Sequence, residues 1–187
     1  MNMKNCLSIL GLAVLYVVLV FACAFIGFLG PWCWVVVFPA LAALLGAIPY
    51  FAAALRWQKF GVATLLSLTL GAFVYATGEC DLIGASLMLL AGVLADVIRL
   101  LTGNDTKCGV SLAYPVLSLG VMAWNMKLWT DTAWYYQGAV DEMGQAYADS
   151  LMQLASLWVL VLTIVLTLVM GYVGIRVVSG KMKSNLK

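Results

Sequence analysis

Long apolar runs with very few charged residues constrain this chain more than any other feature. The run from Cys6 to Leu29 contains no charged residue and is long enough to cross a bilayer as a helix. Of the 187 residues, 65% are hydrophobic and 10% are charged, whereas soluble domains carry about 25% charged residues. A water-soluble core of this size cannot bury so much apolar surface. We therefore expect an all-α membrane protein.

Apolar segments separated by turn signals predict six transmembrane helices in a single domain over residues 1–187. Gly30-Pro31 ends the first helix, and Thr102-Gly103-Asn104-Asp105 ends the fourth. Pro39 predicts a kink in the second helix, while Pro49 and Pro115 lie within predicted helices. The predicted helices cover about residues 6–28, 32–57, 60–77, 82–101, 109–129 and 151–178.

The start of the chain permits a second interpretation. Lys4, the apolar run after it and Ala22-Cys23-Ala24 resemble a signal peptide with its cleavage site. The run is longer than the core of a signal peptide, so we expect an uncleaved first helix.

The charged residues divide between the two sides of the predicted bundle. Bases concentrate on the cytoplasmic side of membrane proteins, so both termini are expected in the cytoplasm. Nine of the ten bases lie on that side: Lys4, Arg56, Lys59, Arg99, Lys107, Arg176, Lys181, Lys183 and Lys187. Six of the eight acids lie on the other side: Glu79, Asp81, Asp131, Asp141, Glu142 and Asp149. The exceptional base is Lys127.

Several function classes are disfavoured. The chain has no histidine, no G-x-S-x-G and no phosphate-binding glycine loop, so we expect no catalytic residue, metal site or cofactor. Active transport would need a separate ATPase. A net charge of +2 disfavours nucleic acid. Cys33 and Cys80 both lie near the outer face, where they either form a disulfide or serve as small apolar residues.

The segment Trp124–Asp149 is the main candidate for function. It holds three Trp, three Tyr, four acids and Lys127, and it is predicted to be an outer loop of more than twenty residues, a length often linked to function. Interface anchoring also explains such aromatic residues. Lys127 either pairs with Asp131 or meets an anionic group of a ligand.

Two other outer turns contribute candidates. The turn at Glu79 places a carboxylate at the outer rim, and the first outer loop carries two tryptophans. Solvated turns and interface anchors are the alternatives. The candidate substrate-binding residues are Trp32, Trp34, Glu79, Trp124, Asn125, Lys127, Trp134, Tyr135, Tyr136 and Tyr147.

Asp96 and Arg99 lie three residues apart near the inner end of the fourth helix. They either pair with each other or contact a cytoplasmic partner protein. Small residues four apart, such as Ala42 and Gly46, indicate close helix packing.

Short motifs in matching order over nearly the whole chain resemble the Trep_Strep (MptD-like) integral membrane proteins. The motifs are Gly30-Pro31, Pro39-Ala40-Leu41-Ala42-Ala43, Lys59-Phe60-Gly61, Ala95-Asp96-Val97-Ile98-Arg99, Ala113-Tyr114, Ser118-Leu119 and Gly144-Gln145-Ala146-Tyr147-Ala148. The family is regarded as substrate-binding S components of energy-coupling factor (ECF) transporters.

The resemblance implies a six-helix S component in the bacterial plasma membrane, working with a transmembrane coupling protein and two cytoplasmic ATPases. Its ligand would be a small micronutrient, either vitamin-like or a chelate such as heme. Many S components dock through Ala-x-x-x-Ala on the first helix. Here the residue four positions after Ala13 is Val17 rather than alanine. Docking through Gly11 and Ala13, with Asp96 and Arg99, is therefore expected. A non-transporting membrane scaffold is the alternative function, and a membrane enzyme is a distant third.

Overall fold

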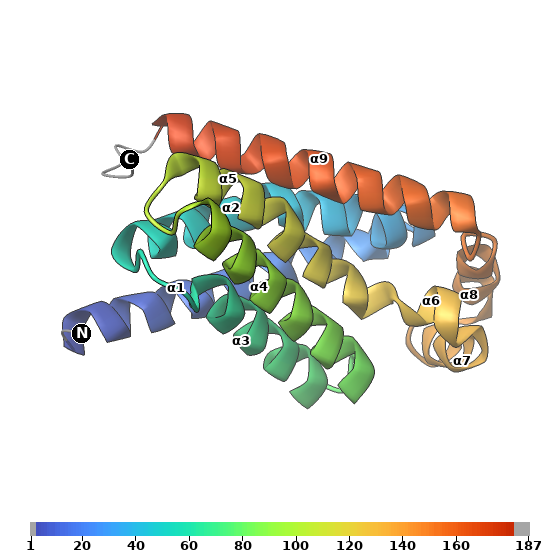
Figure 1. Ribbon diagram of the computed structural model, residues 1–187. Helices are drawn as coiled ribbons and strands as arrows, with labels where there is room; N and C mark the ends of the chain where they lie inside the picture. The colour runs from blue at the N-terminus through green and yellow to red at the C-terminus, as the bar shows by residue number, and fades with distance from the viewer. Residues whose placement is uncertain (1–2, 182–187) are drawn as a thin grey trace.

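The computed structural model describes residues 3–181, with side chains from Leu7 onward, and the regular secondary structure of this part of the chain consists of helices joined by short turns (Figure 1). Lys183, Lys187 and the side chain of Lys4, three of the predicted cytoplasmic bases, lie outside the described residues. The elements are α1 (Met3–Ala24), η1 (Phe25–Leu29), η2 (Cys33–Val37), α2 (Phe38–Arg56), α3 (Val62–Ala76), α4 (Leu82–Thr102), α5 (Lys107–Leu119), η3 (Gly120–Asn125), α6 (Lys127–Thr130), α7 (Thr132–Met143), α8 (Gln145–Met152) and α9 (Leu157–Lys181).

Within the described residues, five stretches are long and apolar enough to cross a membrane: Leu7–Leu29, Cys33–Arg56, Leu82–Thr102, Lys107–Asn125 and Leu157–Lys181. The shorter α3 is also apolar. Many large apolar side chains face outward, such as Leu101 at 80% exposure and Trp158 at 84%. An exterior of this kind suits lipid rather than water. The expected all-α membrane class is confirmed.

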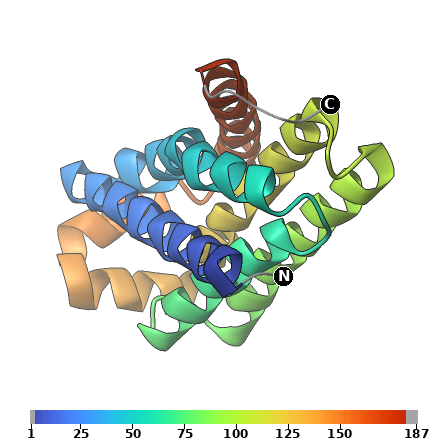
Figure 2. The same ribbon diagram turned by 90° about the vertical axis from the view of Figure 1, so that its left-hand side faces the viewer.

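The membrane-length helices form one bundle with two distinct ends. Figure 1 shows that α1 begins and α9 ends at one end, while α6, α7 and α8 lie at the opposite end. Figure 2 views the bundle from the first of these ends. Arg56, Arg99 and Lys107 lie close to helix termini at this end. The bases that the sequence assigns to one side of the membrane therefore lie at one end of the bundle.

The largest departure from the predicted elements lies in the segment after Trp124. The predicted loop is helical: it contains α6, α7 and α8. Asp131 caps α7 by accepting from the Trp134 N–H at 3.3 Å, and Gly144, with φ of 86°, separates α7 from α8. The predicted last helix accordingly begins at Leu157 rather than at residue 151.

Two other predicted helices change type along their length. The predicted helix over residues 32–57 begins with π-helical turns, η2, in which the Phe38 N–H donates to the Cys33 carbonyl. Pro39 follows directly and has no N–H to give, so the regular α pattern is interrupted near the predicted kink. The predicted helix over residues 109–129 is α-helical only to Leu119 and continues as the 3-10 helix η3.

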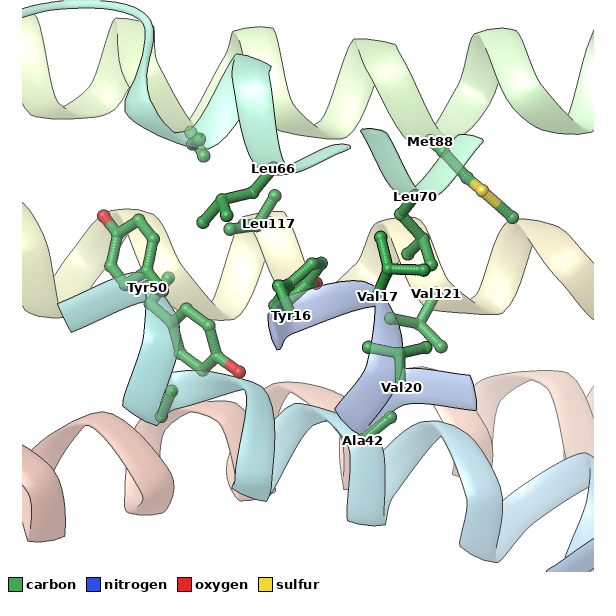
Figure 3. Packing of buried hydrophobic residues seen from close by; sticks show 14 of the residues in the cluster. Tyr16, Val17, Val20, Ala42, Tyr50, Leu66, Leu70, Met88, Leu117 and Val121 are labelled. Carbon is green, nitrogen blue, oxygen red and sulfur yellow. The ribbon is translucent and has the colours of Figure 1, made fainter. Parts of the chain in front are cut away.

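The core lies around α2, which packs against α1, α5 and α9. Figure 3 shows Tyr16, Val17 and Val20 of α1 directed into a cluster that also holds Tyr50, Leu66 and Leu117. The buried Tyr114 hydroxyl donates to the Ala43 carbonyl at 2.5 Å, and that of Tyr50 to the Val110 carbonyl at 3.4 Å. The small residues predicted to permit close packing, Ala42 and Gly46 among them, are buried within the bundle.

An ion pair closes the core at the basic end. Asp96 and Arg99 are both 0% exposed, with 3.5 Å between Oδ1 and Nη1, so of the two alternatives left open by the sequence the structure shows the pair. Asp96 also accepts from the backbone N–H groups of Ala63 and Thr64 at 3.2 and 2.8 Å, at the start of α3. Arg99 donates to the carbonyls of Trp57 and Asn104. Because the two side chains have no exposed surface, they are unsuited to docking a partner protein.

Gly174 permits the close approach of α9 to α2, and its substitution tests this packing. A Cβ at this position would lie 2.6 Å from the Leu44 carbonyl oxygen, a backbone atom that cannot rotate away. Gly174→Ala should destabilise the protein by about 1–3 kcal/mol, measured as a lower midpoint of thermal unfolding in detergent. Gly180→Ala in the same helix is the control, since nothing lies within 4 Å of its Cβ position. Equal midpoints for the two variants would contradict the packing.

Candidate functional site

A cavity of about 670 Å³ opens at the acidic end of the bundle. Its walls come from the end of α1, from η1 and η2, from the turn between α3 and α4, and from α7 and α8. The lining contains eight aromatic residues and three carboxylates. The lining residues are Phe21, Ala24, Phe25, Gly27, Phe28, Trp34, Gly78, Glu79, Trp124, Trp134, Tyr135, Gln137, Gly138, Ala139, Asp141, Glu142, Met143, Tyr147 and Leu151.

The inner wall of the cavity is a set of packed rings. Trp34 stacks on Phe38 with 5.0 Å between ring centroids and 7° between planes. Trp124 meets both rings edge-on, at 5.9 and 5.5 Å, and it stacks beside Phe21 at 6.3 Å. Rings packed in this way hold one another in fixed orientations. They present a rigid apolar surface to the cavity.

Hydrogen bonds attach α7 and α8 to the end of the bundle. The Trp34 indole N–H donates to the Tyr135 hydroxyl at 2.6 Å, and this hydroxyl donates to Asn125 Oδ1 at 3.2 Å. Asn125 Nδ2 completes the triangle by donating to the Trp34 carbonyl at 3.1 Å. In α8, the Tyr147 hydroxyl donates to the Gly27 carbonyl at 3.0 Å. These polar atoms are therefore already engaged in holding the cavity together.

Lys127 lies in an adjoining recess that shares Glu79, Trp124 and Trp134 with the cavity. Its Nζ is 3.4 Å from Asp81 Oδ2 and 3.6 Å from the centroid of the Trp134 ring. The ion pair predicted with Asp131 is not formed, because the Asp131 side chain caps α7. Hydrogen bonding from the Gly84 N–H, together with Lys127, lowers the pKa of Asp81 and keeps this partner ionised. The charge of Lys127 is thus already balanced.

The carboxylates of the main cavity are in a different situation. Asp141 accepts from Gln137 Nε2 at 3.0 Å. Partial burial raises the pKa of Glu142, and repulsion from Glu79 and Asp141 raises it further. Among the described residues, the ion pairs Asp96–Arg99 and Lys127–Asp81 involve none of Glu79, Asp141 and Glu142. The cavity acids therefore have no basic side chain as a partner.

Six of the ten candidate residues from the sequence line this cavity: Trp34, Glu79, Trp124, Trp134, Tyr135 and Tyr147. Asn125 is buried behind the wall and positions it. Lys127 lies in the adjoining recess. The Tyr136 hydroxyl donates to Asp149 at 2.8 Å on the surface, and Trp32 is 54% exposed away from the cavity.

Sequence reasoning missed the contribution of the first helix and two of the acids. Phe21, Phe25 and Phe28 line the cavity, and their spacing of four and three residues places them on one helical face. Three aromatic residues on one face at the outer end of an apolar helix could have indicated from the sequence that this helix contributes to the site. Asp141 and Glu142 lie within the segment already singled out.

Tyr135→Phe should test the hydrogen-bonded triangle. The variant keeps the ring but leaves the Trp34 indole N–H and Asn125 Oδ1 without this partner, which should cost about 1–3 kcal/mol of stability. The measurement is the midpoint of thermal unfolding, followed by tryptophan fluorescence. Tyr136→Phe is the matched control, because its hydroxyl bonds to an exposed carboxylate and its loss should change the midpoint little. A larger effect in the control would contradict the triangle.

Comparison with known proteins identifies a family for the whole chain. Residues 3–183 match Trep_Strep, described as a hypothetical bacterial integral membrane protein family. Comparisons with curated proteins and with solved structures gave no match. The match and the five long apolar helices confirm the predicted multi-pass membrane location. The chain therefore belongs to the Trep_Strep family of bacterial integral membrane proteins.

Proposed function

We propose that this protein is the substrate-binding S component of an ECF-type importer and captures a small micronutrient at its extracytoplasmic end. The observation that carries the proposal is the aromatic cavity at the acidic end of the bundle. Its volume of about 670 Å³ falls in the range of small-molecule sites, roughly 300–1,000 Å³. The flat ring systems of vitamin-like molecules and of planar chelates suit stacking on the aromatic residues of this lining.

The proposed orientation follows from charge. If the basic end is cytoplasmic, the cavity faces outward. This orientation also requires α3 to cross the membrane, because otherwise Arg56 and Arg99, at the ends of α2 and α4, would lie on opposite sides. With 15 residues α3 is short, rising about 22 Å at 1.5 Å per residue. Six crossings with both termini in the cytoplasm are the arrangement that keeps the described bases except Lys127 on one side.

The energy for uptake would come from partner proteins. The sequence lacks a phosphate-binding glycine loop, so the proposal assigns ATP hydrolysis to two cytoplasmic ATPases that act through a transmembrane coupling protein. It gives this chain no catalytic role. Of the two docking residues proposed on α1, Ala13 is 0% exposed and packs in the core, while Gly11 faces outward. Gly11 is therefore the better candidate for contact with the coupling protein.

A first prediction concerns the cavity as the binding site. Native mass spectrometry of protein purified gently from its own host should reveal a bound small molecule at one copy per chain. Gly138 lines the cavity, with nothing within 4 Å of its Cβ position. A leucine side chain there should occupy part of the cavity, so in Gly138→Leu most of the protein should lack the bound small molecule. Ala133→Leu, on an exposed part of the same helix outside the lining, should retain it. Equal occupancy in both variants would refute the site.

A second prediction concerns the partners. Affinity purification from the same host should recover a coupling protein and two ATPases, and Gly11→Leu should reduce their yield severalfold while leaving the small molecule bound. A protein that retains its ligand but never recovers ATPases would favour the alternative function, a non-transporting membrane scaffold.

A further inference from the structure

We propose that the cavity binds an amphipathic organic cation, a protonated or quaternary amine attached to a flat apolar body. This inference rests on the proposed role of the cavity as the binding site, and it adds the chemical class of the ligand.

The charged groups available to a ligand are carboxylates, which carry negative charge and accept hydrogen bonds. Trp34, Tyr135 and Tyr147 use their polar atoms in hydrogen bonds that fix the walls. The charged residues of the lining are Glu79, Asp141 and Glu142, and all three are acids. A buried or partly buried carboxylate is stabilised by an opposite charge. A cationic head group would supply that charge and relieve the mutual repulsion among the three acids.

The aromatic walls suit the same ligand. Ring faces attract cations, most strongly at tryptophan, and the lining contains Trp34, Trp124 and Trp134. The Trp134 ring already binds one cation, because the Lys127 ammonium lies 3.6 Å from the ring centroid on the side of the adjoining recess. The rest of the cavity, lined by phenylalanine rings, offers an apolar surface on which a flat body can stack.

A buried donor in the lining provides an independent sign of a ligand. Trp124 is 4% exposed, and within the described residues its indole N–H has no hydrogen-bond partner. A buried N–H without a partner is energetically unfavourable, because it has lost its hydrogen bond to water. A ligand that carries a carbonyl or ring nitrogen on its apolar body would satisfy this donor.

The position of the acids favours an organic cation over a metal ion. Glu79 lies in the turn between α3 and α4, whereas Asp141 and Glu142 lie on α7. Among the described residues, no three acidic or cysteine side chains come together as a metal site would require. The carboxylates are spread around a space large enough for a ring system.

The test uses two probes that share an indole ring and differ in charge, tryptamine and indole-3-acetate, titrated into ligand-stripped protein and followed by native mass spectrometry. Tryptamine should bind at least about tenfold more tightly, since hydrogen bonds to charged groups contribute about 1.5–3 kcal/mol. Glu79→Gln and Glu142→Gln should each weaken tryptamine binding severalfold. Asp149→Asn is the control, because it removes the same charge from the same end but outside the lining.

Acid should weaken the binding of tryptamine, whose amine stays protonated throughout. The raised pKa of Glu142 means that this carboxylate becomes neutral at a higher pH than an ordinary glutamate, so affinity should begin to fall there as the pH is lowered. Glu79 and Asp141 are the other charged side chains that face the same space. Burial raises the pKa of Tyr147 to about 12, so its hydroxyl stays neutral over this range. In Glu142→Gln the first part of the fall should disappear.

Three outcomes would overturn the inference: tighter or equal binding of indole-3-acetate, no binding of either probe, or carboxylate-dependent capture of Mn²⁺ in place of the amine. The result is separable from the transporter role. Tryptamine binding that depends on Glu79 and Glu142 supports the cation site even if no ATPase is recovered. Recovery of ATPases without amine binding supports the transporter and refutes the cation.

Discussion

The fully buried pair of Asp96 and Arg99 holds together the helix ends on which the rest of the bundle depends. Two charges removed from water each cost several kcal/mol unless their bonding groups are satisfied. Here Asp96 binds the free N–H groups at the start of α3, where a negative charge also favours the helix dipole. Arg99 binds carbonyls just beyond the ends of α2 and α4. One pair thereby fixes three helix termini at the basic end.

The opposite end is built on another principle, and this difference creates the cavity. There α1 and α2 adjoin the irregular helices η1 and η2, which are closed by aromatic stacking and by neutral hydrogen bonds rather than by charge. The Gly27 carbonyl in η1 accepts the Tyr147 hydroxyl, and Trp34 in η2 bonds to Tyr135. α7 and α8 also pack through Tyr135, Tyr147 and Leu151 on a second apolar cluster that contains Val35 and Val36. The cavity lies beside these contacts, between the two helices and the phenylalanine rings of α1 and η1.

The sequence was sufficient for features that depend on composition and period. Long apolar runs located the membrane helices, and i, i+3 spacing predicted the Asp96–Arg99 pair. The sequence was insufficient where the partner of a side chain depends on which residues the fold brings close to it. Lys127 has Asp131 four residues away, but the capping role of Asp131 and the approach of the α3–α4 turn give it Asp81 instead. Nor could spacing show that Tyr136 turns to Asp149 while Tyr135 turns to Trp34, 101 residues away.

The partner of Lys127 also changes the expected charge of a ligand. As a lone base beside aromatic residues, Lys127 suggested a hook for an anion. Once Asp81 neutralises it, the described residues of this end retain an excess of acids, three of them in the cavity. A cavity with apolar walls concentrates the field of such charges and draws in ions of opposite sign. An anionic ligand would have to overcome that field without a basic side chain in the lining to receive it, whereas a cation would be attracted from the outside and then held by carboxylates and ring faces together.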